Sequence, residues 1–203
     1  VNESWMSLKD VLARPVREAA LGEVLGAVRR QMTLVRGAMD GSMLRNEIHN
    51  FTRIGTFVER ADNTARILDV KYYVLLPSVQ LVGSTLDNVQ WETILRAASA
   101  YRSYRHVYHD RFRAKNIADY LILRPEMPRS LVFCMNEVFS NLQAVANDHS
   151  HETLRRAGRL RADLQFSRID EILATGLHAY LTQFLDRVSD LGYGVSRDFL
   201  MPV

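Results

Sequence analysis

Apolar residues recur at steps of three and four along most of the chain, the spacing that lines one face of an α-helix. No stretch alternates apolar and polar residues in the way that a half-buried strand does. The pattern therefore predicts an all-α fold, an antiparallel bundle of long helices joined by short connections. We expect helices at residues 2–13, 16–39, 44–76, 87–108, 117–123, 131–146 and 153–191.

Proline, glycine and capping residues set the expected helix ends. Pro15 and Pro77 each interrupt an apolar pattern, because proline has no backbone N–H to continue a helix. The stretch PSVQLVGS that begins at Pro77 is predicted as a linker, and Asp87 or Asn88 can cap the helix after it. We expect the last helix to bend near Gly176.

The helix predicted at 44–76 has apolar residues on two faces. Its core face carries Ile54, Phe57, Val58, Ala61, Ala65, Leu68 and Tyr72. The opposite face carries the aliphatic residues Ile67, Val70 and Val74. Since a surface helix would not place three aliphatics there, we expect a central helix covered on both sides, with the segment ERADNTAR at 59–66 buried in the bundle.

The same segment carries a set of polar residues, Glu59, Arg60, Asp62, Asn63 and Arg66. Glu59 and Asn63, and likewise Asp62 and Arg66, are four residues apart, the separation at which side chains meet on a helix. In a helix enclosed on both sides this set would be partly buried and would have to satisfy its own hydrogen bonds. We expect it to form either a structural network or the lining of a polar groove.

Composition and charge are those of an ordinary globular protein. The 203 residues are 47% hydrophobic and 24% charged, which suits one domain over residues 1–203. The net charge of +3 is small and dispersed, which argues against a nucleic-acid surface.

The strongest basic patch is YRSYRHVYHDRFRAK at 101–115. Its bases alternate with rings that could stack on nucleic-acid bases: Arg102, Arg105, Arg111, Arg113 and Lys115 with Tyr101, Tyr104, Tyr108 and Phe112. The helical spacing of the tyrosines favours rings that face inward while the arginines stay solvated. We expect weak, salt-sensitive nucleic-acid binding at most.

Cysteine usage and hydropathy bear on the compartment. Cys134 is the only cysteine, so the chain cannot form an internal disulfide, which fits the cytoplasm. Its neighbours are large and apolar, so we interpret it as a small core residue rather than a nucleophile. No apolar run approaches the roughly 20 residues of a membrane span, and we expect no membrane partner.

Few residues are placed for metal or covalent chemistry. The chain has no Glu-x-x-His pair, no Gly-x-Ser-x-Gly motif and no phosphate-binding glycine loop. We expect no cofactor, and the only candidates for a metal site are Glu59, Asp62 and His178. Arg129 and Ser130 precede the helix at 131–146, where free N–H groups could hold an anion; a simple helix cap is the alternative.

Several motifs carry a family resemblance. The segment IGTFVERADNTARILDVKYYVLLPS is preceded by GAMDGSMLRNEIHNF and followed in order by DNVQWETILRAASAYRSY, MPRSLVFC and GLHAYL. In these motifs the chain resembles the alpha-E domain family of bacterial proteins, over essentially its whole length. Family members resemble a duplicated helical arrangement in which an earlier ERAENTAR-like segment precedes this one. The resemblance implies that this sequence lacks an upstream portion of the full-length protein.

The resemblance also implies a biochemical setting. Alpha-E proteins are encoded beside, or fused to, circularly permuted ATP-grasp proteins and transglutaminase-like proteins. The implied role is a noncatalytic accessory, binding or scaffold component of a peptide- or amide-ligase system. Its expected partners are an ATP-grasp-type ligase, a transglutaminase-like protein and a peptide ligand. The alternative is an enzyme subunit that uses the carboxylate-rich helix with a bound metal or anion.

Overall fold

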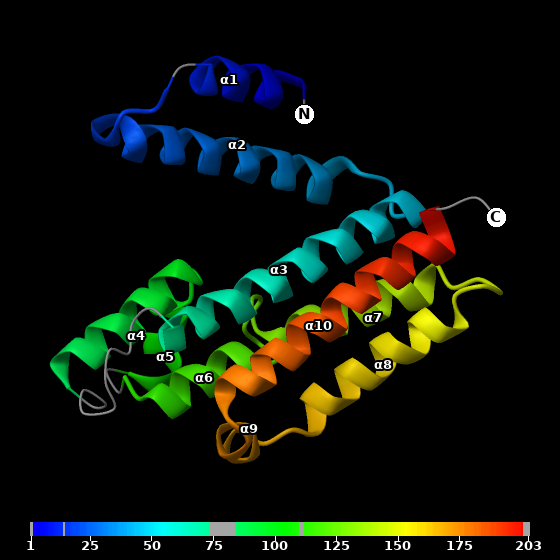
Figure 1. Ribbon diagram of the computed structural model, residues 1–203. Helices are drawn as coiled ribbons and strands as arrows, with labels where there is room; N and C mark the ends of the chain where they lie inside the picture. Colours follow the sequence, from blue (N-terminus) through cyan, green and yellow to red (C-terminus); the bar gives the residue numbers. More distant parts are fainter. Residues whose placement is uncertain (1, 14, 74–83, 110–111, 201–203) are drawn as a thin grey trace. The chain divides into compact units, whose positions relative to one another are not determined.

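The computed structural model describes residues 2–13, 15–73, 84–109 and 112–200, and every regular element within these ranges is helical (Figure 1). The predicted all-α class is confirmed. Four features of the sequence predictions lie outside the described part of the chain: the linker at 77–83, Val74, Arg111 and the side chain of Tyr72.

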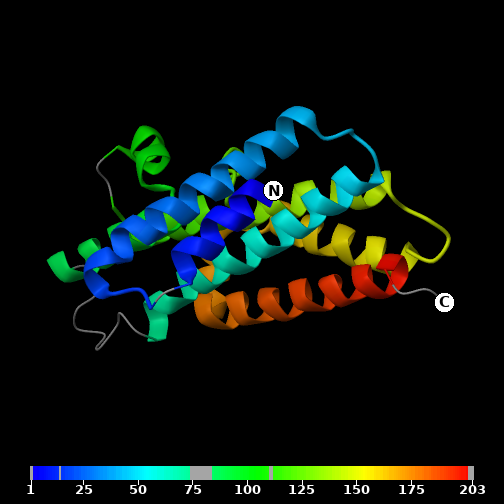
Figure 2. The same ribbon diagram turned by 90° about the horizontal axis from the view of Figure 1, so that it is seen from above.

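The chain divides into two compact units, residues 1–49 and residues 50–203. The first contains α1 (Asn2–Leu12), a 3₁₀ turn η1 (Glu18–Ala20) and α2 (Leu21–Ser42), and α1 lies along α2 (Figures 1 and 2). Helix α2 begins later than the predicted residue 16, because Arg17 is extended, with φ −75° and ψ 148°, and a 3₁₀ turn follows it. None of the described residues of this unit is buried.

Helix α3 (Glu47–Tyr73) runs from the end of the first unit into the second. The second unit continues with α4 (Thr85–Ala97), α5 (Tyr101–Tyr108), α6 (Ala114–Ile122), α7 (Leu131–Ala144), α8 (His151–Phe166), α9 (Ile169–Thr175), α10 (Leu177–Val195) and a π-helical turn η3 (Ser196–Leu200). Helix α7 packs against α8, and α10 packs against α8 and α9 (Figure 1). An antiparallel course of these helices around one core stays a prediction.

The hydrophobic core lies in the second unit and receives side chains from each of the helices α3 to α10. From α3 it receives residues at steps of three and four, each at most 3% exposed: Ile54, Phe57, Ala61, Ala65 and Leu68. These are the residues predicted for the core face of this helix, and Val58, predicted with them, is half-buried against the core.

The helix predicted at 87–108 is two helices. Ser84, rather than Asp87 or Asn88, caps the first, since its Oγ accepts a hydrogen bond from the backbone N–H of Asp87 at 3.2 Å. Helix α4 ends at Ala97, and Ser99 has a φ of 54°, a left-handed conformation that a helix cannot continue through. The turn carries neither glycine nor proline, so the sequence pattern gave no sign of it.

The helix predicted at 153–191 is three helices. Gly176, where a bend was expected, has a φ of 99° and separates α9 from α10. A second break was not expected: Ser167 and Arg168 are extended, with ψ values of 149° and 139°. Phe166, the last residue of α8, is 78% exposed, because the chain leaves the helix immediately after it and the helical spacing of apolar residues no longer holds.

Candidate functional site

The polar residues of the segment ERADNTAR form paired contacts along α3. Arg66 donates from Nε to Asp62 Oδ2 at 2.7 Å and from Nη2 to Asp62 Oδ1 at 3.0 Å, a two-pronged ion pair. This hydrogen bonding raises the pKa of Arg66 above its usual value. Asn63 Nδ2 donates to Glu59 Oε1 at 3.4 Å. Both predicted four-residue pairs are therefore present in the structure.

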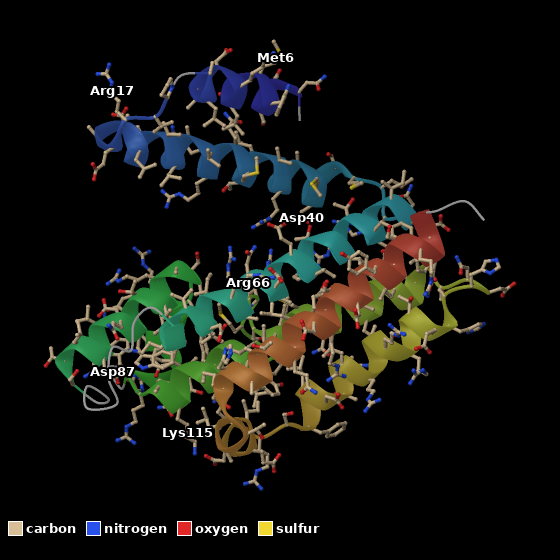
Figure 3. All side chains as sticks on the ribbon, in the orientation of Figure 1. Met6, Arg17, Asp40, Arg66, Asp87 and Lys115 are labelled. Atoms are coloured by element: carbon tan, nitrogen blue, oxygen red, sulfur yellow. The ribbon has the colours of Figure 1, made fainter. Side chains whose placement is uncertain are left out.

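These pairs are not enclosed. The side chain of Arg66 is 64% exposed, and Glu59 and Asn63 are exposed as well (Arg66 is labelled in Figure 3). The prediction that this set is partly buried within the bundle is wrong for these three residues, because the other helices of the second unit do not cover the side of α3 that carries them. We call Glu59, Asp62, Asn63 and Arg66 the α3 strip.

The aliphatic residues on that side of α3 differ in how far they are exposed. Ile67 is half-buried and packs against the core, whereas Val70 is 41% exposed. The expected shelter on both sides of this helix is therefore incomplete at Val70.

Arg60, next to Glu59 in sequence, does not belong to the strip. Its Nη1 donates to the carbonyl oxygen of Pro128 at 3.0 Å, and its guanidinium lies 4.7 Å from the ring centroid of Phe57. Arg53 lies over the same ring at 4.6 Å and forms an ion pair with Glu137 of α7. Arg60 and Arg53 therefore hold α3 to α7 and to the turn before it, and Arg60 has a structural contact that Glu59 lacks.

Ser130 is a helix cap. It is fully buried, its Oγ accepts a hydrogen bond from the backbone N–H of Phe133 at 3.1 Å, and its hydroxyl donates to the carbonyl oxygen of Arg124 at 2.6 Å. Of the two interpretations of this segment, the structure shows the cap, because the hydroxyl is already committed to the backbone. An anion held by Arg129 and Ser130 stays a prediction.

His178 lies next to a carboxylate other than the two predicted with it. Its Nδ1 lies 2.7 Å from Asp69 Oδ1, a contact between α10 and α3. The other two metal candidates are occupied on α3, where Glu59 accepts from Asn63 and Asp62 from Arg66. Within the residues that the structure describes, no three His, Cys, Asp or Glu side chains come together as a metal site would require.

A buried ionic group joins α3 to α4, and the sequence predictions missed it. Lys71 Nζ lies 2.6 Å from Asp87 Oδ1, with the two side chains 1% and 9% exposed (Asp87 is labelled in Figure 3). Lys71 also donates to Gln90 and lies 5.5 Å from the ring centroid of Trp91. The sequence spacing indicates that Lys71 is buried: Leu68 follows Thr64 by four residues and Lys71 follows Leu68 by three, which places all three on the core face.

The aromatic rings of the basic segment at 101–115 pack inside the fold. Tyr104 is fully buried, its ring stacks on Tyr108 at a centroid distance of 4.8 Å, and Tyr101 stacks on Phe112 at 5.9 Å. The prediction that the aromatics face inward is confirmed.

Cys134 is also buried as predicted, and burial raises the pKa of its thiol to about 12, which keeps it protonated.

An open groove of about 440 Å³ lies between the end of α6, α7 and the connection from α8 to α9. Three arginines line it, Arg124, Arg161 and Arg168, with Asp119 as the single acid. We call this the arginine groove. Sequence reasoning missed it, because its arginines lie far apart along the chain and belong to no motif.

A second hollow, of about 410 Å³, lies between α8 and α10 and is also rich in arginine. Here acids and bases pair with one another: Glu152 accepts hydrogen bonds from Arg155 and Arg156, which lower its pKa to about 2. Arg187, which lines the same hollow, forms an ion pair with Asp163. Of the arginine side chains that line it, only that of Arg159 has no hydrogen-bond or ion-pair partner within the described residues.

Helix α3, the longest of the described helices, carries the Glu-Arg pair Glu59-Arg60. The family model described as "Alpha-E: a predicted alpha-helical domain with a conserved ER motif" matches residues 1–200. The chain belongs to the Alpha-E family. Glu59-Arg60 is its only Glu-Arg dipeptide, so we assign the ER motif to these residues. No curated protein and no solved structure matches the chain.

None of the helices in the described part of the chain combines the length and the apolar character that a bilayer crossing requires.

Proposed function

We propose that this Alpha-E chain is a noncatalytic binding or scaffold component of a peptide- or amide-ligase system. Its partner in this proposal is an ATP-grasp-type ligase, with a transglutaminase-like protein in the same system and a cytoplasmic setting. The proposal takes its biochemical setting from the resemblance of the sequence motifs to alpha-E proteins.

The observation that carries the proposal is the exposure of the α3 strip beside the ER motif. Arg60 holds this part of α3 against Phe57 and the turn at Pro128, so the helix beneath the strip is fixed. Glu59, Asn63 and Arg66 are exposed on that fixed helix, with the partly exposed Val70 one turn beyond. A rigid helix that presents charges beside an aliphatic residue suits protein docking, where charge pattern selects the partner.

The test exchanges the charges of one ion pair and leaves the pair intact. In Asp62→Arg/Arg66→Asp the pair can re-form within α3, while the charge pattern seen by a partner is inverted. We expect at least about a tenfold loss of affinity for the ATP-grasp-type ligase, since like charges juxtaposed in an interface are costly. Affinity is measured by titration of the purified ligase onto the immobilised Alpha-E protein.

The chain supplies a matched control on α4. Glu92 and Arg96 form the same four-residue pair, with side chains 33% and 59% exposed, against 33% and 64% for Asp62 and Arg66. Glu92→Arg/Arg96→Glu should leave ligase affinity unchanged. Equal losses in the two double variants would show that the α3 strip is not the docking surface, and the absence of any association with the ligase at micromolar concentration would overturn the proposal itself.

A further inference from the structure

The arginine groove has an excess of positive charge that its own residues do not neutralise. Arg124 donates to the Tyr108 hydroxyl at 3.2 Å and lies 3.7 Å from Asp119, whereas Arg161 donates to a neutral partner, Asn136, at 2.9 Å. The side chain of Arg168 is exposed and has neither a hydrogen bond nor an ion pair among the residues that the structure describes. Three guanidinium groups around one carboxylate therefore favour an anionic ligand, which arginine binds through two parallel N–H donors.

The other polar groups of the groove favour a carboxylate on a peptide chain over a phosphate. Asp119 would repel a doubly charged phosphate, but it retains lone pairs that can accept from an N–H group. Asn136 and Gln165 line the same groove, and an amide both donates and accepts, as a peptide group does.

Apolar side chains complete the wall of the groove. Leu123, Val132, Leu164 and Ile169 line it together with the polar groups. This combination suits a ligand that has both an apolar side chain and charged or amide groups. The volume of about 440 Å³ lies within the roughly 300–1,000 Å³ typical of ligand pockets and has room for a few residues rather than a folded domain.

From these contacts we infer that the arginine groove binds the C-terminal end of a short peptide, with its carboxylate on the arginines and an apolar side chain against Leu123 and Ile169, the more accessible of the apolar lining residues. The inference rests on the proposed function only in naming a peptide of the ligase system as the natural source of the carboxylate. Its physical basis is the groove, which includes no residue of the α3 strip.

The probe is a pool of fluorescein-labelled tripeptides randomised at the last two positions, prepared with a free C-terminal carboxylate and, separately, as the C-terminal amide. Fluorescence anisotropy should show saturable binding of the carboxylate pool, weakened by added salt, and at least about tenfold weaker binding of the amide pool. Acetate should displace the carboxylate pool at lower concentration than inorganic phosphate does.

Two matched variants locate the binding. Arg168→Gln removes an exposed, unpartnered guanidinium from the arginine groove and no capping bond, since the side chain of Arg168 does not cap α9. It should weaken binding of the carboxylate pool by about tenfold and leave the amide pool unchanged. Arg159→Gln removes an arginine whose side chain is also exposed and unpartnered, from the hollow between α8 and α10, and should change the binding of neither pool.

Each contrary outcome overturns the inference. These outcomes are no saturable binding below about 1 mM, equal binding of the two pools, an equal effect of Arg159→Gln and Arg168→Gln, and stronger displacement by phosphate than by acetate. The proposed function is separable from this test, because Arg168→Gln should bind the ATP-grasp-type ligase as wild type does, while Asp62→Arg/Arg66→Asp should bind the carboxylate pool as wild type does.

Discussion

At the scale of single residues, Lys71 shows how a buried charge is accommodated in this fold. Its ammonium group has three donors, and Asp87, Gln90 and the ring of Trp91 surround it at the junction of α3 and α4. All but three of the 26 basic residues are arginines, so a lysine at this buried position is unusual for the chain. A compact ammonium fits between two close helices where a planar guanidinium is bulkier.

Neutralising Asp87 should therefore be costly. Asp87→Asn keeps the size of the side chain but leaves the ammonium of Lys71, 1% exposed, without its anion. We expect a loss of about 3–5 kcal/mol in the free energy of unfolding, the usual cost of removing one partner of a buried ion pair. The control is Asp62→Asn, which breaks the exposed pair with Arg66 and should cost less than about 1 kcal/mol. Urea unfolding measures both, and equal small losses would mean that Lys71 is hydrated.

At the scale of secondary-structure elements, the packing of α10 against α8 depends on a close approach at Gly194. A Cβ atom built on Gly194 would lie 2.5 Å from the Oγ1 of Thr153, and that hydroxyl donates to Asp198 of η3. Adding a methyl group would push Thr153 aside and disturb its bond to Asp198, so the contact joins α8, α10 and the C-terminal turn.

Alanine scanning of two neighbouring glycines tests this contact. Gly194→Ala should reduce the free energy of unfolding by about 1–3 kcal/mol, the typical cost of overpacking. Gly192→Ala lies in the same helix with no atom within 4 Å of the added Cβ, so it should stabilise by about 0.5–1 kcal/mol through higher helix propensity. Thermal or urea unfolding compares the two, and the same sign for both would show that α8 and α10 are not tightly packed there.

The elements show which parts of the fold were predictable from sequence. Steps of three and four identified the core face of α3 from Ile54 to Leu68, because burial of one helix face imposes that spacing. The breaks at Ser99 and at Ser167–Arg168 carry no glycine or proline, so tertiary packing rather than local preference ends those helices.

The candidate sites were less predictable than the helices. Periodicity placed Glu59, Asp62, Asn63 and Arg66 correctly relative to one another. It could not show whether the second apolar side of α3, with Ile67 and Val70, is covered by the chain or left open. The arginine groove depends on contacts between residues that lie far apart in sequence, which no local pattern encodes.

At the scale of the whole molecule, the two units differ in how they bury apolar side chains. Among the residues that the structure describes, the buried core residues all lie at position 54 or later, whereas the first unit leaves large apolar side chains exposed, among them Trp5, Met6, Leu34 and Leu44 at 64–75%. Exposed apolar surface of this kind is prone to association. The described residues of the first unit therefore add association-prone surface but no buried core residue.

A chain of residues 44–203 should therefore fold cooperatively by itself. It keeps Asn46, whose Oδ1 accepts a hydrogen bond from the backbone N–H of His49 at 3.3 Å in the first turn of α3. It also retains Trp91, 6% exposed, as its single tryptophan, so fluorescence reports the core alone. We expect its urea midpoint to match that of Trp5→Phe in the chain of residues 1–203, with a slightly smaller denaturant dependence because less surface is exposed on unfolding. A chain of residues 44–203 that is unfolded without urea would show that the first unit is required for the core to form.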